Sequence, residues 1–94
     1  MRIELLDLPR TVARLLVALA RAEAAGYGAA TYDYLAHELA AGVAWVKQSA
    51  ADARRRGLVA VTARPGRGHK AAVTLTPEGR RLAGQSPTPR EPRA

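Results

Sequence analysis

Apolar residues recur at three- and four-residue spacing along the first half of the chain, which is the pattern of helices with one buried face. The first stripe consists of Val12, Leu15, Leu16 and Leu19. Gly26 and Gly28 follow it, and glycine commonly ends a helix. The pattern therefore predicts a helix that begins near Pro9 and ends before Gly26.

Two further helices are predicted with only a short break between them. Leu35, Ala36 and Leu39 indicate a helix over 32–40 with Thr31 as its N-cap, and Val46, Ala50 and Ala53 indicate a longer, basic helix over 43–56. The break falls at Ala41–Gly42, and Gly57 follows the second helix as a C-terminal cap. A short helix, a tight turn and a longer basic helix form a helix-turn-helix, whose second helix lies in the DNA major groove.

Beyond Gly57 the pattern changes to two short β-type runs, LVAVTA at 58–63 and AAVTLT at 71–76. The intervening residues 64–70, RPGRGHK, contain a proline and two glycines that favour a turn, so a hairpin is predicted. Thr76, Pro77 and Glu78 then combine a cap, a first-turn proline and a first-turn acid, which predicts a short helix through about Ala83.

Three pieces of this chain resemble the helix-turn-helix and wing of winged-helix regulators, most closely the MarR-like family. They are Leu35-Ala36 with Leu39, Arg56-Gly57-Leu58-Val59, and Thr74-Leu75-Thr76-Pro77-Glu78-Gly79. The resemblance covers roughly half the chain and implies a DNA-binding protein. The family usually carries long flanking helices that build its dimer and effector cleft. This chain stops where the last of them would begin, so a small-molecule effector is not expected.

The resulting fold class is α+β, mostly α: a winged helix-turn-helix with a three-helix core, a two-stranded wing and a short C-terminal helix. The domain is expected to span 1–84. The remaining residues, 85–94, contain three prolines and no apolar stretch, so a disordered tail is predicted there. Any dimer is expected to use the first helix, the N-terminal lead-in with Ile3, Leu5 and Leu6, or the short C-terminal helix.

The net charge of +7 is strongly segregated. Up to Ala53 acidic residues slightly outnumber basic ones, whereas the remainder holds ten Arg and Lys against Glu78 and Glu91. Such a basic region is typical of a protein with a polyanionic partner. A solubilising surface is the alternative, and an anionic membrane fits less well because the basic residues lie on a turn-rich segment.

Other classes of site find little support in the sequence. There is no cysteine, which excludes disulfides and thiolate metal sites, and His37 and His69 lie on different elements. No carboxylate pair, nucleophile–base arrangement or phosphate-binding loop is present. We therefore expect no enzymatic activity, no cofactor and no metal. A signal peptide and a membrane span are also not expected, which favours a cytoplasmic, nucleoid-associated protein.

The predicted base contacts come from the N-terminal half of the helix over 43–56. Lys47 can donate to guanine, Gln48 can bind adenine through two hydrogen bonds, and Ala44 or Val43 can touch a thymine methyl group. Trp45 has two interpretations. It either presses on the DNA backbone or covers the gap between the two helices with its ring against Tyr34 or Tyr32, and the structural role is slightly favoured.

The predicted phosphate and minor-groove contacts surround these residues. Arg54, Arg55 and Arg80 are candidates for phosphate, and Tyr32 is a further one, although a tyrosine at that position more often closes the edge of a small core. The wing tip supplies Arg64, Arg67, His69 and Lys70, and Arg67 between two glycines can enter a minor groove. Asp52 would meet phosphates unfavourably, which suggests that the helix tilts away after two turns.

The leading hypothesis is a double-stranded DNA-binding protein, a small homodimeric transcriptional regulator that reads the major groove with helix 43–56 and the minor groove with the wing at 64–70. One alternative is an architectural or replication/partition protein of a mobile element that coats DNA with little sequence preference. Another is a winged helix that binds a protein subunit instead of DNA.

Overall fold

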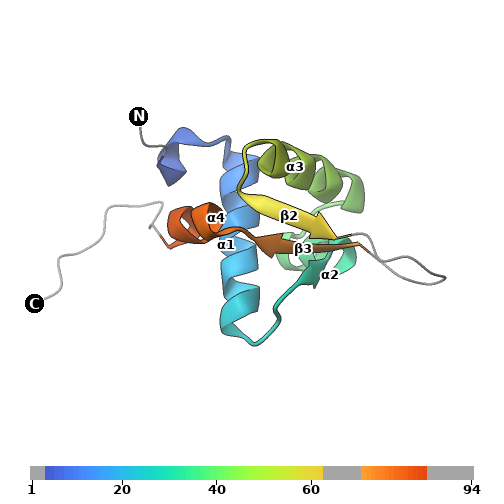
Figure 1. Ribbon diagram of the computed structural model, residues 1–94. Coiled ribbons are helices and arrows are strands. Elements are labelled where there is room, and N and C mark those ends of the chain that lie inside the picture. Colours follow the sequence, from blue (N-terminus) through green and yellow to red (C-terminus); the bar gives the residue numbers. More distant parts are fainter. Residues whose placement is uncertain (1–3, 63–70, 85–94) are drawn as a thin grey trace, which may run out of the picture.

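The computed structural model describes residues 4–62 and 71–84, and all structural statements concern these residues. Helices and strands follow one another in the order η1, α1, β1, α2, α3, β2, β3, α4 (Figure 1). Their bounds are η1 Leu5–Asp7, α1 Arg10–Ala24, β1 Ala30–Thr31, α2 Tyr32–Leu39, α3 Val43–Arg55, β2 Val59–Thr62, β3 Ala72–Leu75 and α4 Pro77–Ala83. The predicted α+β winged helix is confirmed.

The three strands form one antiparallel sheet in the order β1-β3-β2. Val59 pairs with Leu75 and Val61 with Val73 across β2 and β3, as a hairpin requires. The prediction of a two-stranded wing was incomplete, because β1 adds a third strand in which Ala30 pairs with Val73. With two residues, β1 is too short to show any alternation in the sequence.

The ends of the three core helices share one backbone arrangement. After α1, Gly26 has φ +99° and Tyr27 N–H donates to the carbonyl of Ala22, and after α3 Gly57 has φ +76° and Leu58 N–H donates to Ala53. These left-handed residues close Schellman caps, in which the turn satisfies the last carbonyls of the helix.

The break between α2 and α3 contains the predicted Ala41–Gly42, and its left-handed residue is Ala40, with φ +52°. Ala41 N–H donates to the carbonyl of Ala36 and completes the same type of cap. Gly42 has an ordinary φ of −75° and is the N-cap of α3. An alanine in this conformation carries a steric cost that glycine would not.

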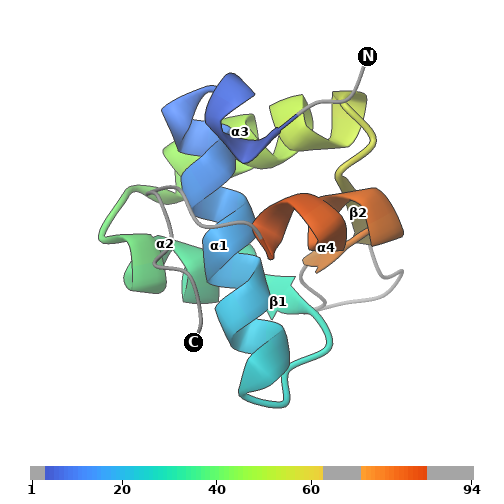
Figure 2. The ribbon, with the colours of Figure 1, turned by 90° about the vertical axis from the view of Figure 1, so that its left-hand side faces the viewer.

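Helix α1 passes through the centre of the domain, with α2 and α4 on either side of it and the sheet behind (Figure 2). The predicted apolar stripes of all three core helices are buried, and residues of the strands and α4 complete the same cluster. The largest fully buried side chains are Leu5, Leu15, Leu16, Leu35, Leu82, Val12, Val46 and Val73.

Thr76 joins the start of α4 to the end of α3. Its hydroxyl donates to the carbonyl of Gly57 at 2.7 Å and accepts from Gly79 N–H at 3.1 Å, and its own N–H donates to Leu58 at 3.1 Å. Gly79 also lies directly against this backbone. An added Cβ would stand 2.9 Å from the carbonyl carbon of Leu58 and closer still to its oxygen. Only glycine fits at this contact.

The N-terminal lead-in was predicted to expose Leu5 and Leu6 together, and this prediction is wrong for Leu5. Leu5 is 1% exposed and belongs to the core, whereas Leu6 is 71% exposed. The short 3₁₀ turn of η1 points these neighbours in different directions, which the sequence did not indicate. Ile3 lies outside the described residues, as does the predicted tail at 85–94.

Candidate nucleic-acid interface

The helix-turn-helix is built from α2, the turn at 40–42 and α3. Thr31 caps α2 as predicted, because its hydroxyl oxygen accepts from Tyr34 N–H at 3.1 Å. Leu35 and Leu39 of α2 and Val46 of α3 are buried in the same core, which fixes the two helices against each other. The outer face of α3 is thereby held in one orientation.

The predicted inner and outer faces of α3 are confirmed. Val46, Ala50 and Ala53 are fully buried, and Ser49 joins them on this face. The outward side chains are those of Ala44, Lys47, Gln48, Ala51, Arg54 and Arg55. Val43 is half-buried and packs against the core, so it offers less to a ligand than Ala44 does. The N-terminal half of α3 therefore presents small and polar side chains with no carboxylate among them.

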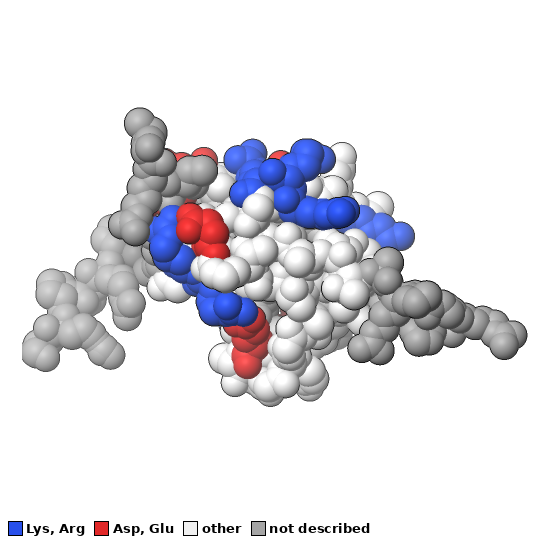
Figure 3. All heavy atoms as spheres, viewed as in Figure 1, with Lys and Arg blue, Asp and Glu red and all other residues white. Residues whose placement is uncertain are grey.

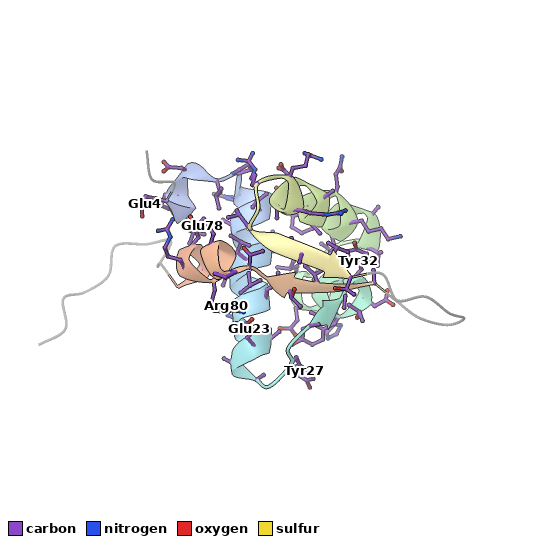
Figure 4. All side chains as sticks on the ribbon, in the orientation of Figure 1. Glu4, Glu23, Tyr27, Tyr32, Glu78 and Arg80 are labelled. Carbon is purple, nitrogen blue, oxygen red and sulfur yellow. The ribbon has the colours of Figure 1, made fainter. Side chains whose placement is uncertain are left out.

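Tyr32 and Lys47 lie together where α2 and α3 begin. The Lys47 ammonium stands over the tyrosine ring, 5.8 Å from its centroid, at the distance of a cation–π contact. Tyr32 is half-buried, and it follows the pairing of Thr31 with Ala72 at the end of the sheet (Figure 4). This tyrosine thus closes the edge of the core and also carries a cation on its exposed face.

Trp45 is half-buried against the core, in agreement with the structural interpretation. The partners predicted for its ring were wrong. The Arg14 guanidinium lies over the ring, 5.7 Å from the centroid, and donates to the carbonyl of Leu39 at 3.1 Å. Tyr34 instead pairs with Tyr27, with ring centroids 5.5 Å apart. The Arg14 contact had no signal in the sequence, because that residue belongs to α1, far away along the chain.

Arginines gather at the C-terminal end of α3, where cations are favoured by the helix dipole. Figure 3 shows Lys and Arg side chains concentrated over this helix. Asp52 accepts from Arg55 at 3.3 Å and from Arg56 at 3.2 Å, so its carboxylate is neutralised within the helix. Arg54 is exposed beside them. With its charge paired in this way, Asp52 no longer requires α3 to tilt away from phosphates.

Arg80 is positioned differently from the expectation that it binds phosphate. Its guanidinium donates twice to Glu23 of α1, at 3.0 and 2.8 Å, and once to the carbonyl of Leu75 at 3.4 Å. This pairing lowers the pKa of Glu23 and raises the pKa of Arg80, chiefly through the side-chain hydrogen bonds. Figure 4 shows both residues near the start of α4, well away from Tyr32. Arg80 ties α4 to α1.

The remaining predicted contacts, Arg64, Arg67, His69 and Lys70, lie outside the described residues. Strands β2 and β3 lead directly into this segment from the side of the molecule where α2 lies (Figure 1). Within the described ranges 4–62 and 71–84, no group of histidines and carboxylates could hold a metal ion. Over the same ranges, no helix has the length and apolar character needed to cross a membrane.

Comparison with solved structures identifies the same architecture in several proteins. A probable transcriptional regulator from Pseudomonas aeruginosa is 27% identical, with a TM-score of 0.67 over 82% of this chain and 54% of its own. BpsR of Bordetella bronchiseptica, whose DNA binding is regulated by 6-hydroxynicotinic acid, is 28% identical, with a TM-score of 0.66 over 81% of this chain and 54% of its own. No family model and no curated protein matches the sequence.

A more distant structure, the MarR family regulator NMB1585 of Neisseria meningitidis, is 19% identical, with a TM-score of 0.64 over 83% of this chain and 51% of its own. The chain spans about half the length of these proteins. It has the winged-helix fold found in MarR-family regulators, as the sequence resemblance predicted.

Proposed function

We propose that this chain binds double-stranded DNA as a small transcriptional regulator, with α3 in the major groove and the segment 64–70 in the minor groove. The observation that carries the proposal is the outward face of α3. Its N-terminal half presents Ala44, Lys47 and Gln48 to solvent, with no acidic side chain in that half. The winged-helix neighbours, which include transcriptional regulators, support the same conclusion.

The exposed side chains have the chemistry needed to read base edges. Lys47 can donate to guanine O6 and N7, Gln48 can donate to and accept from adenine, and the Ala44 methyl can contact thymine. A good bidentate contact contributes about 1–3 kcal/mol of discrimination against a wrong base. The cation–π contact with Tyr32, at 5.8 Å, favours a position of the Lys47 ammonium beside that ring.

Affinity in the proposal comes from the arginines at the end of α3 and from the basic segment 64–70. Arg54 is exposed, and the side chain of Arg55 is 72% exposed despite its ion pair with Asp52. Such an exposed pair is weak in water and can exchange its carboxylate for a phosphate. Arg80 is not part of the proposed interface, because Glu23 already accepts two of its hydrogen bonds.

Two copies are proposed to act together as a homodimer on one operator in the cytoplasm. A two-fold axis between them would require an inverted repeat, with half-site centres about 34 Å apart along the DNA.

The experiment is selection of bound sequences from a pool of random duplexes at two salt concentrations. We expect enrichment of an inverted repeat, and steep loss of total binding at the higher salt because phosphate contacts release counterions. Gln48→Ala should relax preference at one position of each half-site. Lys47→Ala should relax the base preference at another position and weaken DNA binding. Arg21→Ala removes the same charge from α1 and should change neither the base preference nor the affinity.

The other outcomes of this selection discriminate the alternatives. Retention without any enriched sequence would favour an architectural or partition protein that coats DNA. No retention at low salt would refute DNA binding and would favour the protein-binding winged helix. An unchanged selected sequence with Gln48→Ala would refute base readout by that residue while leaving DNA binding intact.

A further inference from the structure

A groove is lined by residues of η1, α1 and the C-terminal end of α2. In Figure 2, η1 lies above α1 and α2 lies beside it. The groove encloses about 710 Å³. Apolar side chains of Leu6, Leu8, Val17 and Leu39 line it, and Leu6 is 71% exposed. The exposed Leu6 and the groove beside it offer apolar surface into which the side chains of a partner can pack.

The same groove has a cationic rim. Arg10, Arg14 and Arg21 line it, and Glu38 is the one acidic residue among its lining. Arg14 is committed to the carbonyl of Leu39 and to the ring of Trp45. Within residues 4–62 and 71–84, neither Arg10 nor Arg21 forms a hydrogen bond or ion pair. Two cations beside an apolar floor therefore have no acceptor in the described part of the chain.

The shape of the groove indicates what kind of element would fill it. Its lining from α1 comes from positions 10, 13, 14, 17, 18 and 21, a stripe with the three- and four-residue spacing of one helix face. This stripe extends for about 17 Å at 1.5 Å per residue. No strand residue lines the groove, so an extended segment would find no backbone edge to pair with. A helix laid beside α1 would bury the stripe over its whole length.

We propose that this groove docks an amphipathic helix of a partner protein, with leucine-like residues on one face and glutamate or aspartate along its borders. The borders would pair with Arg10 and Arg21 while the apolar face covers Leu6 and Val17. This inference does not depend on DNA binding, because the groove shares no residue with the outward face of α3.

Charge disfavours two other occupants. A second copy of this chain, related by a two-fold axis, would bring three rim arginines against three more with a single glutamate from each copy. The segment 85–94 of the same chain has two arginines and three prolines against one glutamate, which suits neither the rim nor a helix. An acidic helix from another protein satisfies both the apolar floor and the cationic rim.

The test uses two synthetic peptides of about 18 residues, long enough to populate a helix in water. Both carry leucines at helical spacing, and glutamates border the leucine face in one whereas lysines border it in the other. Binding is followed by the fluorescence of Trp45, the single tryptophan, whose ring lies under the groove residue Arg14. The acidic peptide should bind and saturate, and the lysine peptide should bind at least tenfold more weakly.

Variants separate docking from unspecific attraction. Arg10→Ala combined with Arg21→Ala should lower the affinity for the acidic peptide about tenfold or more, as expected for the loss of two ion pairs. Arg54→Ala combined with Arg55→Ala removes the same net charge from α3 and should leave the affinity unchanged. Leu6→Ser should weaken binding of the acidic peptide. The Leu6→Ser protein and the Arg10→Ala, Arg21→Ala double variant should both keep the melting temperature of the original protein.

Three results would overturn the proposal. The peptides could bind equally, which would make the groove merely apolar. The Arg10, Arg21 and the Arg54, Arg55 double variants could lose affinity for the acidic peptide equally, which would show that the peptide is attracted by net charge and not by the groove. Alternatively, sedimentation could show a dimer that Leu6→Ser dissociates, which would assign the groove to a second copy of the chain.

Discussion

Replacement of Gly79 by alanine tests the contact that joins α4 to the end of α3. The new Cβ would lie 2.9 Å from the carbonyl carbon of Leu58 and closer to its oxygen, whereas carbon atoms in contact prefer about 3.5–4.0 Å. The carbonyl carbon alone would have to move by about 0.6 Å to reach that range, and the closer oxygen requires the backbone of Leu58 to move further. This backbone also accepts a hydrogen bond from Thr76 N–H at 3.1 Å, which the movement would weaken.

The magnitude follows from three opposing effects. Overpacking costs about 1–3 kcal/mol, and the strained hydrogen bond adds about 0.5–1.5 kcal/mol. The higher helix propensity of alanine returns about 0.5–1 kcal/mol. Taking the middle of each range, the free energy of unfolding should fall by about 2 kcal/mol, from a total of about 5–14 kcal/mol for a domain of this length. The melting temperature should fall by about 8–16 °C.

Thermal and urea unfolding followed by circular dichroism measures this change, and Gly84→Ala is the matched control. Gly84 lies at the end of the same helix, where an added Cβ would be 3.5 Å from the nearest carbonyl oxygens, an ordinary contact. The control should change stability by no more than about 0.5 kcal/mol. Equal melting temperatures for the two variants would refute the reasoning about the Leu58 contact.

Three further predictions use other features of the fold. Ala40→Gly should raise the free energy of unfolding by about 0.5–1 kcal/mol, because glycine adopts φ +52° without the steric cost of a Cβ; urea unfolding that shows a loss would contradict this. Because Arg80 lowers the pKa of Glu23, their pairing stabilises the fold above the ordinary pKa of a glutamate and is lost as pH falls through the lowered value. Glu23→Gln should remove this part of the pH dependence of the free energy of unfolding, measured between pH 6 and 2. A pH profile identical to that of the original protein would contradict this. Arg14→Ala should shift the fluorescence maximum of Trp45 by exposing its ring, and an unshifted spectrum would show that the guanidinium does not cover it.

Local signals account for what the sequence predicted well. The helix-turn-helix, the caps at Thr31, Gly57 and Thr76, and the inner and outer faces of α3 depend on residues within a few positions of one another. Periodicity and cap chemistry report such short-range relations directly. The face of α3 proposed to read bases was available from sequence for this reason.

The contacts that the sequence missed join distant parts of the chain. Glu23 and Arg80 are separated by 57 residues, and Arg14 reaches Leu39 and Trp45 from another helix. A single sequence shows which cations exist but not which carboxylates lie opposite them. The left-handed conformation of Ala40 had no signal in the sequence, because glycine and not alanine usually occupies such a position.

The hydroxyl of Thr76 has a consequence for the entropy of the proposed DNA complex. It connects the end of α3, through the carbonyl of Gly57, to the first turn of α4, which directly follows β3. Helix and sheet are therefore preorganised relative to each other before a duplex arrives, and no ordering cost between them is incurred on binding. Any mismatch between their spacing and the DNA grooves must then be met by deformation of the DNA, which makes the flexibility of each base step part of the recognition.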